Sequence, residues 1–310
     1  MIEVVKHLLG NVYTLFTDPA TVEIIANEDG SVWLDTLTQS SIRTGLYLDP
    51  DDRKRIIELM ANEMAQVTTT DRPYVSAIFP GTNERFQGQL PPLVSAPTFS
   101  IRMPARKVLT LADQLRLGTI TQAQLAVLQE ALANRRNIMI IGATGSGKSS
   151  FANSLLDDAV MLSDRHIIIQ DLPELRTRAP NCTTFFTRAS NPPITAQFNL
   201  FLALRNRPDR IHVGECRDGE TLLQLFKAWN TGHPGGLTTL HADSAEDALY
   251  RIEDLFGEVT QQTPYRQITR TVGLVVEIRK TPTGRKVTRM ISDIRHEPGV
   301  GYRFQEVAAA

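Results

Sequence analysis

A glycine-rich segment at 142–149 carries the clearest chemistry in this 310-residue sequence. It matches the pattern G-x-x-x-x-G-K-[ST], follows an apolar run at 138–141 and precedes a stretch that favours a helix. Glycines let a backbone fold tightly around phosphate oxygens and aim its N–H groups at them. The new helix presents its positive end to the same anion. A chance glycine-rich turn is the alternative, and the flanking strand and helix disfavour it.

This segment predicts a site for ATP and Mg²⁺. Lys148 would place its ammonium near the β- and γ-phosphates, and the Ser149 hydroxyl would ligate Mg²⁺. The residues expected to bind the nucleotide are Gly142, Ala143, Thr144, Gly145, Ser146, Gly147, Lys148, Ser149 and Ser150.

Glu215 is the candidate for the hydrolytic acid, because it follows a strand-like run at 210–214. The carboxyl ends of strands in an open α/β sheet face the ligand crevice, and a glycine at 214 permits close approach of a ligand. There Glu215 would polarise a water against the γ-phosphate, or hold Mg²⁺ through water. A surface glutamate at a strand end is the alternative.

Two further strand-like runs end in groups that ionise. Asp171 follows the run at 167–170 and is itself followed by Glu174. It would accept a hydrogen bond from the attacking water or from metal-bound water; helix capping or a plain salt bridge is the alternative. His241 follows the run at 237–240 and would detect a γ-phosphate by hydrogen bonding. A purely structural histidine is the other reading.

The composition and net charge argue against several classes of protein. The net charge of −1 lacks the basic excess of a dedicated nucleic-acid binder, so no direct sequence-specific nucleic-acid binding is expected. The two cysteines, Cys182 and Cys216, form no CxxC pair and are expected to be reduced core thiols. No stretch approaches the roughly 18 apolar residues of a membrane span. Residues 1–16 form an amphipathic pattern that predicts a short helix docked on its own domain, and lying on a membrane surface is the alternative.

Strand-like runs alternate with helical stretches after residue 116, which predicts a parallel sheet with helices on both faces. The helices are expected at 121–135, 149–156, 196–205, 221–229 and 245–256. Late strands at 272–279 and 302–307 are expected in an antiparallel appendage. This ATPase domain is expected to span 116–310.

The first hundred residues have a different character. A hairpin is expected at 22–35 and a capped helix at 49–66, within a small α+β domain over 1–100. Residues 101–115 are expected to form a linker between the two domains.

Several blocks together resemble one family. The run 204–218, LRNRPDRIHVGECRD, is similar to the Walker B segment of the type IV secretion traffic ATPases, which are hexameric secretion ATPases. The run 228–242 resembles their histidine box, and the strongest resemblance is to the TrbB-like conjugal-transfer branch. The segments 85–92 and 99–102 resemble landmarks of the same branch, so the resemblance covers about residues 20 to 260.

The resemblance implies a fold, an assembly and a cellular role. The fold is an α/β RecA-like P-loop NTPase domain with a smaller N-terminal α+β domain, and ATP lies between the domains. The assembly is a homo-oligomeric ring, a hexamer, with inner-membrane components of the machinery as partners. The role is that of an ATP-hydrolysing motor for type IV secretion or conjugative transfer, cytoplasmic and peripherally associated with the inner membrane.

The resemblance also implies roles for single residues. Glu215 would be the Walker B glutamate and a metal-site residue with Ser149, and His241 the box histidine. Asp171 and Glu174 would belong to the acidic box. Arg102 or Arg85 would neutralise γ-phosphate charge from the N-terminal side, with three competitors for that role: Arg205, Arg207 and Arg217.

One position departs from the family pattern. Gln170 stands where family members usually carry the glutamate of a Glu-Asp pair. Either that acid is dispensable or catalysis depends on Glu215.

Other functions compete with this one. A type II secretion or type IV pilus assembly ATPase is the main alternative, although many carry a four-cysteine metal module that two cysteines cannot supply. A RecA-type nucleic-acid motor and a small-molecule kinase are the remaining alternatives.

Overall fold

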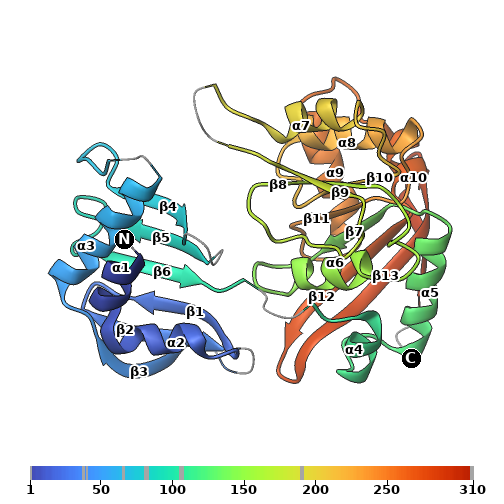
Figure 1. The fold of residues 1–310 in the computed structure, drawn as a ribbon. Coiled ribbons are helices and arrows are strands. Elements are labelled where there is room, and N and C mark those ends of the chain that lie inside the picture. Colours follow the sequence, from blue (N-terminus) through green and yellow to red (C-terminus); the bar gives the residue numbers. More distant parts are fainter. Residues whose placement is uncertain are drawn as a thin grey trace. The chain divides into compact units, whose positions relative to one another are not determined.

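The computed structural model describes residues 2–36, 39, 41–64, 67–79, 84–104, 108–188 and 192–307. The chain divides into two compact units, Met1–Lys107 and Val108–Ala310, and each is described by itself (Figure 1). An antiparallel sheet forms the centre of the first unit, and a mostly parallel sheet forms the centre of the second.

The first unit contains a six-stranded antiparallel sheet in the order β3-β2-β1-β6-β5-β4. Its strands are β1 (Thr21–Ala26), β2 (Ser31–Thr36), β3 (Ile42–Tyr47), β4 (Tyr74–Ile78), β5 (Arg85–Gln89) and β6 (Thr98–Arg102). Its helices are α1 (Ile2–Leu9), the 3-10 helix η1 (Gly10–Tyr13), α2 (Thr14–Thr17) and α3 (Pro50–Glu63). Alternate residues of β5 and β6 are buried, because one face of the sheet packs into the core that α3 covers.

Three expectations for this unit are confirmed. The hairpin at 22–35 is β1 and β2, and the helix expected at 49–66 is α3. Asp49 caps α3 by accepting a hydrogen bond from the backbone N–H of Asp51. The amphipathic N-terminal segment docks on its own unit, because its buried apolar residues belong to the unit's core: Val5, Leu9, Val12 and Phe16.

The linker expected over 101–115 is shorter in the structure. Residues 101 and 102 end strand β6, and residues 111–115 lie in helix α4 (Leu111–Arg116). Thr110 caps that helix in a capping box with Asp113, which explains why the helix begins there. Residues 105–107 of the expected linker lie outside the described residues.

The second unit contains an eight-stranded sheet in the order β14-β13-β12-β7-β11-β10-β8-β9. Its strands are β7 (Ile138–Ile141), β8 (His166–Gln170), β9 (Cys182–Phe186), β10 (Arg210–Val213), β11 (Leu237–Leu240), β12 (Leu274–Thr281), β13 (Gly284–Glu297) and β14 (Gly301–Glu306). The six strands from β12 to β9 are parallel, as the alternating pattern predicts.

Helices cover both faces of this sheet (Figure 1). Beyond α4, they are α5 (Gln122–Ala133), α6 (Lys148–Leu156), α7 (Ala196–Ala203), α8 (Gly219–Asn230), α9 (Asp247–Gly257) and α10 (Tyr265–Thr271). Successive side chains of β7 point to opposite faces: Met139 and Ile141 pack with α7 to α10, and Ile138 and Ile140 pack with α4 to α6. The expected α/β fold with a smaller α+β unit is therefore observed.

The antiparallel appendage expected at 272–279 is wrong for its first strand. β12 joins the main sheet parallel to β7, and its first five residues are buried as in a central strand. The long strand β13, which the sequence analysis missed, then runs antiparallel between β12 and β14. The strand expected at 302–307 is β14, and β9 was also missed.

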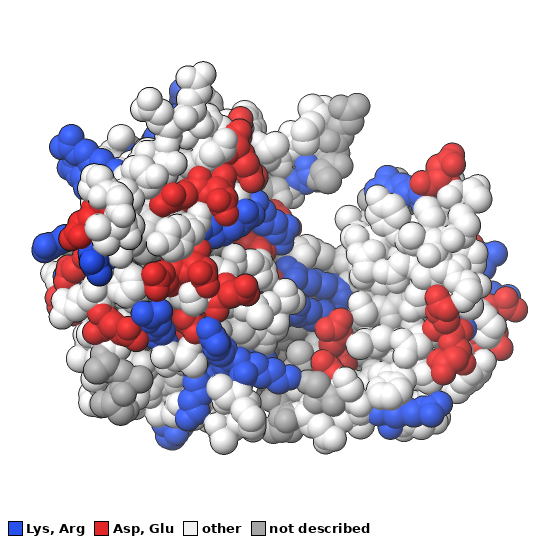
Figure 2. Space-filling view, turned by 180° about the vertical axis from the view of Figure 1, so that it is seen from behind, with Lys and Arg blue, Asp and Glu red and all other residues white. Residues whose placement is uncertain are grey.

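None of the helices in the described part of the chain has the length and apolar character that crossing a bilayer requires. On the face of the second unit seen in Figure 2, basic side chains are interspersed with acidic ones. This mixed surface agrees with the net charge of −1.

Candidate nucleotide site

The glycine-rich loop joins β7 to α6 and adopts a conformation that needs its glycines. Gly142, Gly145 and Gly147 have φ of 147°, 74° and 105°, in the region that disfavours other residues. A Cβ on Gly142 would lie 2.3 Å from the carbonyl oxygen of Ile278 in β12. A Cβ on Gly147 would lie 2.5 Å from Cδ of Arg285 in β13. The loop is therefore seated directly on the β12–β13 hairpin.

The groups of this loop fit a phosphate. Lys148 is 9% exposed, and its Nζ donates to the carbonyls of Gly142 at 2.8 Å and Ala143 at 3.1 Å. The Ser146 hydroxyl is buried and has no hydrogen-bond partner among the residues that the structure describes. The N–H groups in the first turn of α6 point toward the loop, as those at any helix start do, and no side chain in the described ranges caps them. A phosphate oxygen would be a suitable acceptor for the Ser146 hydroxyl and for the N–H groups of this first turn.

Five polar side chains at the carboxyl edge of the parallel strands form one chain of contacts. Lys148 Nζ lies 3.4 Å from Nδ1 of His241, and Nε2 of His241 lies 2.8 Å from Oε1 of Glu215. Arg217 donates to the other oxygen of Glu215 from Nε at 3.0 Å and from Nη2 at 2.8 Å. Its Nη1 donates to Asp171 at 2.8 Å. Three of the acids and bases expected from strand ends therefore meet beside the lysine.

Glu174 takes a different position, over the start of α6. Its carboxylate accepts a hydrogen bond from the Ser149 hydroxyl. Mg²⁺ prefers oxygen ligands and is commonly held by one or two carboxylates together with substrate phosphates. A hydroxyl and a carboxylate beside a phosphate loop supply such oxygens. Gln170 faces the loop that carries Glu174 rather than the lysine: its carboxamide bonds the backbone of residues 174 and 175.

The arginines separate into distinct groups. Arg85 and Arg102 belong to the first unit, where they lie directly opposite each other on β5 and β6. Arg205 packs 3.7 Å over the ring of Phe201 in α7. Arg217 is the competitor that the structure brings to the acids, and bonding to Glu215 is the main reason that the pKa of its guanidinium is raised.

Arg207 is exposed and has a positive φ of 49°. Arg285, against the phosphate loop, was missed by the sequence analysis because β13 itself was not recognised.

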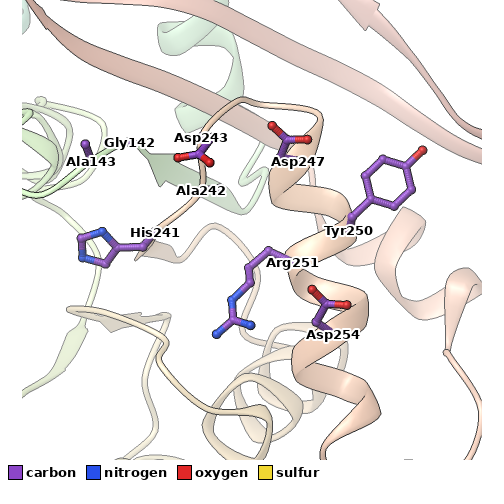
Figure 3. Close-up of a pocket in the computed structure, with 9 residues that line it drawn as sticks. All are labelled: Gly142, Ala143, His241, Ala242, Asp243, Asp247, Tyr250, Arg251 and Asp254. Carbon is purple, nitrogen blue, oxygen red and sulfur yellow. The ribbon is translucent and has the colours of Figure 1, made fainter.

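A pocket of about 390 Å³ opens beside the start of the loop (Figure 3). Its lining comes from the loop, from the segment after β11 and from one face of α9: Gly142, Ala143, His241, Ala242, Asp243, Asp247, Tyr250, Arg251 and Asp254. The α9 residues recur at helical spacing, so a single face of that helix forms one wall.

A family model described as "Type II/IV secretion system protein" matches residues 57–293. The chain belongs to this family. It is 38% identical over 284 residues to the "Probable conjugal transfer protein TrbB" of Sinorhizobium fredii, covering 91% of this chain and 86% of that protein. It is 26% identical over 320 residues to the "Type IV secretion system protein VirB11" of Bartonella quintana, covering 89% of each chain.

This secretion-family chain also shares its fold with a solved ATPase structure. The X-ray structure of the Legionella pneumophila ATPase DotB matches it with a TM-score of 0.66 at 18% identity, covering 91% of this chain and 79% of that chain. The similarity shows that the two chains have the same fold.

Proposed function

We propose that this chain is an ATP-hydrolysing traffic ATPase that powers a type IV secretion or conjugative transfer system. The observation that carries the proposal is the contact chain that links Lys148 in the phosphate loop through His241 to Glu215. Family membership and the conjugal-transfer relatives support the cellular role over the alternative of type II secretion or pilus assembly.

The phosphates of ATP would be bound by the loop 142–147, the first turn of α6 and Lys148. Ser149 and Glu174 would hold Mg²⁺, with Glu215 contributing through water; when bound, the metal neutralises charge on the β- and γ-phosphate oxygens. His241 would lie beside the γ-phosphate, because its Nδ1 faces the lysine.

Glu215 would orient the attacking water and accept its proton. The water oxygen forms a bond to the γ-phosphorus while the bond from that phosphorus to the β–γ bridging oxygen breaks, leaving ADP and phosphate. Asp171 would act through Arg217, which joins the two carboxylates.

The assembly is part of the proposal. Copies of the chain would form a ring, a hexamer, at the cytoplasmic face of the inner membrane, bound to membrane components of the machinery. Arg85 or Arg102, which belong to the first unit, would neutralise the γ-phosphate.

The test is the variant Glu215→Gln, which keeps the size of the side chain and removes the base. We expect turnover to fall by roughly 100-fold or more, with Mg·ATP affinity retained. Phosphate release and nucleotide titration measure the two properties. Near-normal turnover in this variant would refute the role of Glu215.

A further inference from the structure

Two buried carboxamide side chains hold the loop that follows β8. Gln170 ends β8 and is 6% exposed, and Asn153 lies in α6 and is 2% exposed. The loop between them carries Glu174, whose carboxylate reaches the Ser149 hydroxyl. The position of Glu174 therefore depends on what fixes its backbone.

Gln170 uses both ends of its carboxamide. Oε1 accepts hydrogen bonds from the backbone N–H of Glu174 at 3.0 Å and of Leu175 at 2.7 Å. Nε2 donates to the carbonyl oxygen of Leu175 at 3.2 Å. A carboxylate in the same place would set an oxygen against the Leu175 carbonyl, since it has no proton to donate. The repulsion between these oxygens would push the loop away and weaken the two N–H bonds as well.

Asn153 holds the same loop from the side of α6. Its Nδ2 donates to the carbonyl oxygen of Glu174 at 2.9 Å, and its Oδ1 accepts from the N–H of Arg176 at 2.8 Å. Asn153 lies four residues after Ser149 in the same helix, one turn along it. The backbone of Glu174 is thus bonded at its N–H by Gln170 and at its carbonyl by Asn153.

We propose that Gln170 and Asn153 are positioning residues that set Glu174 against Ser149 and thereby determine the metal affinity of the nucleotide site. The inference rests on the proposed function, because it takes Ser149 and Glu174 to be at the Mg²⁺ position. It assigns the amide at 170 a task that a carboxylate cannot perform. Partners that orient a metal's ligands typically account for roughly 10- to 100-fold in metal affinity.

The test compares the same substitution at two buried glutamines. Gln170→Glu removes one donor from the loop after β8. Gln124→Glu is the control: Gln124 is 1% exposed, its Oε1 accepts from Thr121 N–H at 3.0 Å and its Nε2 donates to Val287 O at 3.1 Å. Both variants lose a buried donor to a carbonyl, but the control lies in the capping box of α5. Asn153→Asp removes the donor to the Glu174 carbonyl from the α6 side of the loop. This variant replaces Gln170→Glu in the test if Gln170→Glu does not fold.

Two measurements on these variants test the proposal. The first is hydrogen exchange at the amides of Glu174 and Leu175 in the nucleotide-free protein, which does not depend on any activity. The second is the binding of Mn²⁺ with ADP, followed by electron paramagnetic resonance. We expect Gln170→Glu to lower protection of both amides and to weaken Mn²⁺ binding roughly 10- to 100-fold, while metal-free ADP affinity stays within about twofold. The control variant should keep wild-type exchange at these amides and wild-type Mn²⁺ affinity.

Two results would overturn the inference. One is Mn²⁺ binding and amide exchange in Gln170→Glu that match the control variant. The other is faster ATP turnover in Gln170→Glu, because the carboxylate would then be serving as a base. If the wild-type protein bound neither nucleotide nor Mn²⁺, the proposed function would fail separately, and the exchange measurement would still decide whether Gln170 holds the loop.

Discussion

Both oxygens of Glu215 have a partner: Oε1 lies 2.8 Å from Nε2 of His241, and Oε2 accepts hydrogen bonds from Arg217. A carboxylate held in this way has a fixed orientation at the end of β10, and charge-assisted bonds are stronger than neutral ones. Arg217 also spans the gap to Asp171, so one guanidinium sets the separation of two acids. At the scale of single residues, Arg217 is therefore the group on which the geometry of the acids depends.

Replacing Arg217 with alanine should lower turnover by roughly 10- to 100-fold and leave ADP affinity near the wild-type value. The two carboxylates would lose their shared cation and repel each other, so Glu215 would no longer be held in place. Steady-state phosphate release measures the effect. Arg116→Ala is a suitable control, because Arg116 pairs with Asp113 on the surface of α4. Equal turnover in the two variants would contradict the role of Arg217.

The strands that position the site could be predicted from the sequence because they are buried on both faces. β7, β10 and β11 are buried along their full length, so their apolar runs stand out and the polar residue that follows each is conspicuous. β13 was missed because charged residues such as Lys286 and Asp293 interrupt its pattern. Arg285 was therefore missed with it. The task of Gln170 was also hidden, since the partners of an amide depend on the path of the loop.

A chain of hydrogen bonds links strands β8, β10 and β11 inside the sheet. The N–H of Leu237 in β11 donates to Nδ1 of His212 at 3.0 Å, so His212 carries its proton on Nε2. That nitrogen lies 2.9 Å from Nδ1 of His166, whose Nε2 lies 2.6 Å from the carbonyl of Met161. Every donor finds an acceptor only when both rings are neutral. Burial lowers the pKa of both histidines, and the nearby Arg210 guanidinium lowers them further.

This element should make the second unit sensitive to acid. Because the pKa of both histidines is lowered in the folded chain, the unfolded chain binds protons at them more readily below about pH 6.5. The free energy of unfolding should therefore fall as pH drops below that value, with a limiting slope of about 1.4 kcal/mol per pH unit for each proton that only the unfolded chain binds.

Urea unfolding between pH 7.5 and 5 tests this expectation. In a Trp33→Phe background, Trp229 is the remaining tryptophan and reports on the second unit. Adding His212→Leu should flatten the dependence on pH and lower the stability at pH 7.5. A slope that His212→Leu leaves unchanged would show that other groups are responsible.

At the scale of the whole molecule, the residues proposed to bind ATP belong to two units. The phosphate loop, its lysine and the acids lie in the second unit, and the paired Arg85 and Arg102 lie in the first. If those arginines meet the γ-phosphate, ATP makes contacts that ADP cannot, and only such differences shift a conformational equilibrium.

Replacing Arg85 or Arg102 with alanine should therefore reduce turnover while ADP affinity changes by no more than about twofold. The larger loss should identify the arginine that reaches the γ-phosphate. Phosphate release and ADP titration on both single variants provide the comparison. Wild-type turnover in both variants would show that neither arginine of the first unit takes part in ATP hydrolysis.

The central claim is that the loop 142–149 and its lysine bind the terminal phosphates of ATP. The most direct test is Lys148→Ala, with Mg·ATP affinity measured by calorimetry on the purified protein and phosphate release measured alongside. Because the variant removes a charged donor from a site where it bonds a phosphate, we predict at least roughly tenfold weaker binding and no detectable phosphate release. Wild-type affinity together with wild-type phosphate release would contradict the account.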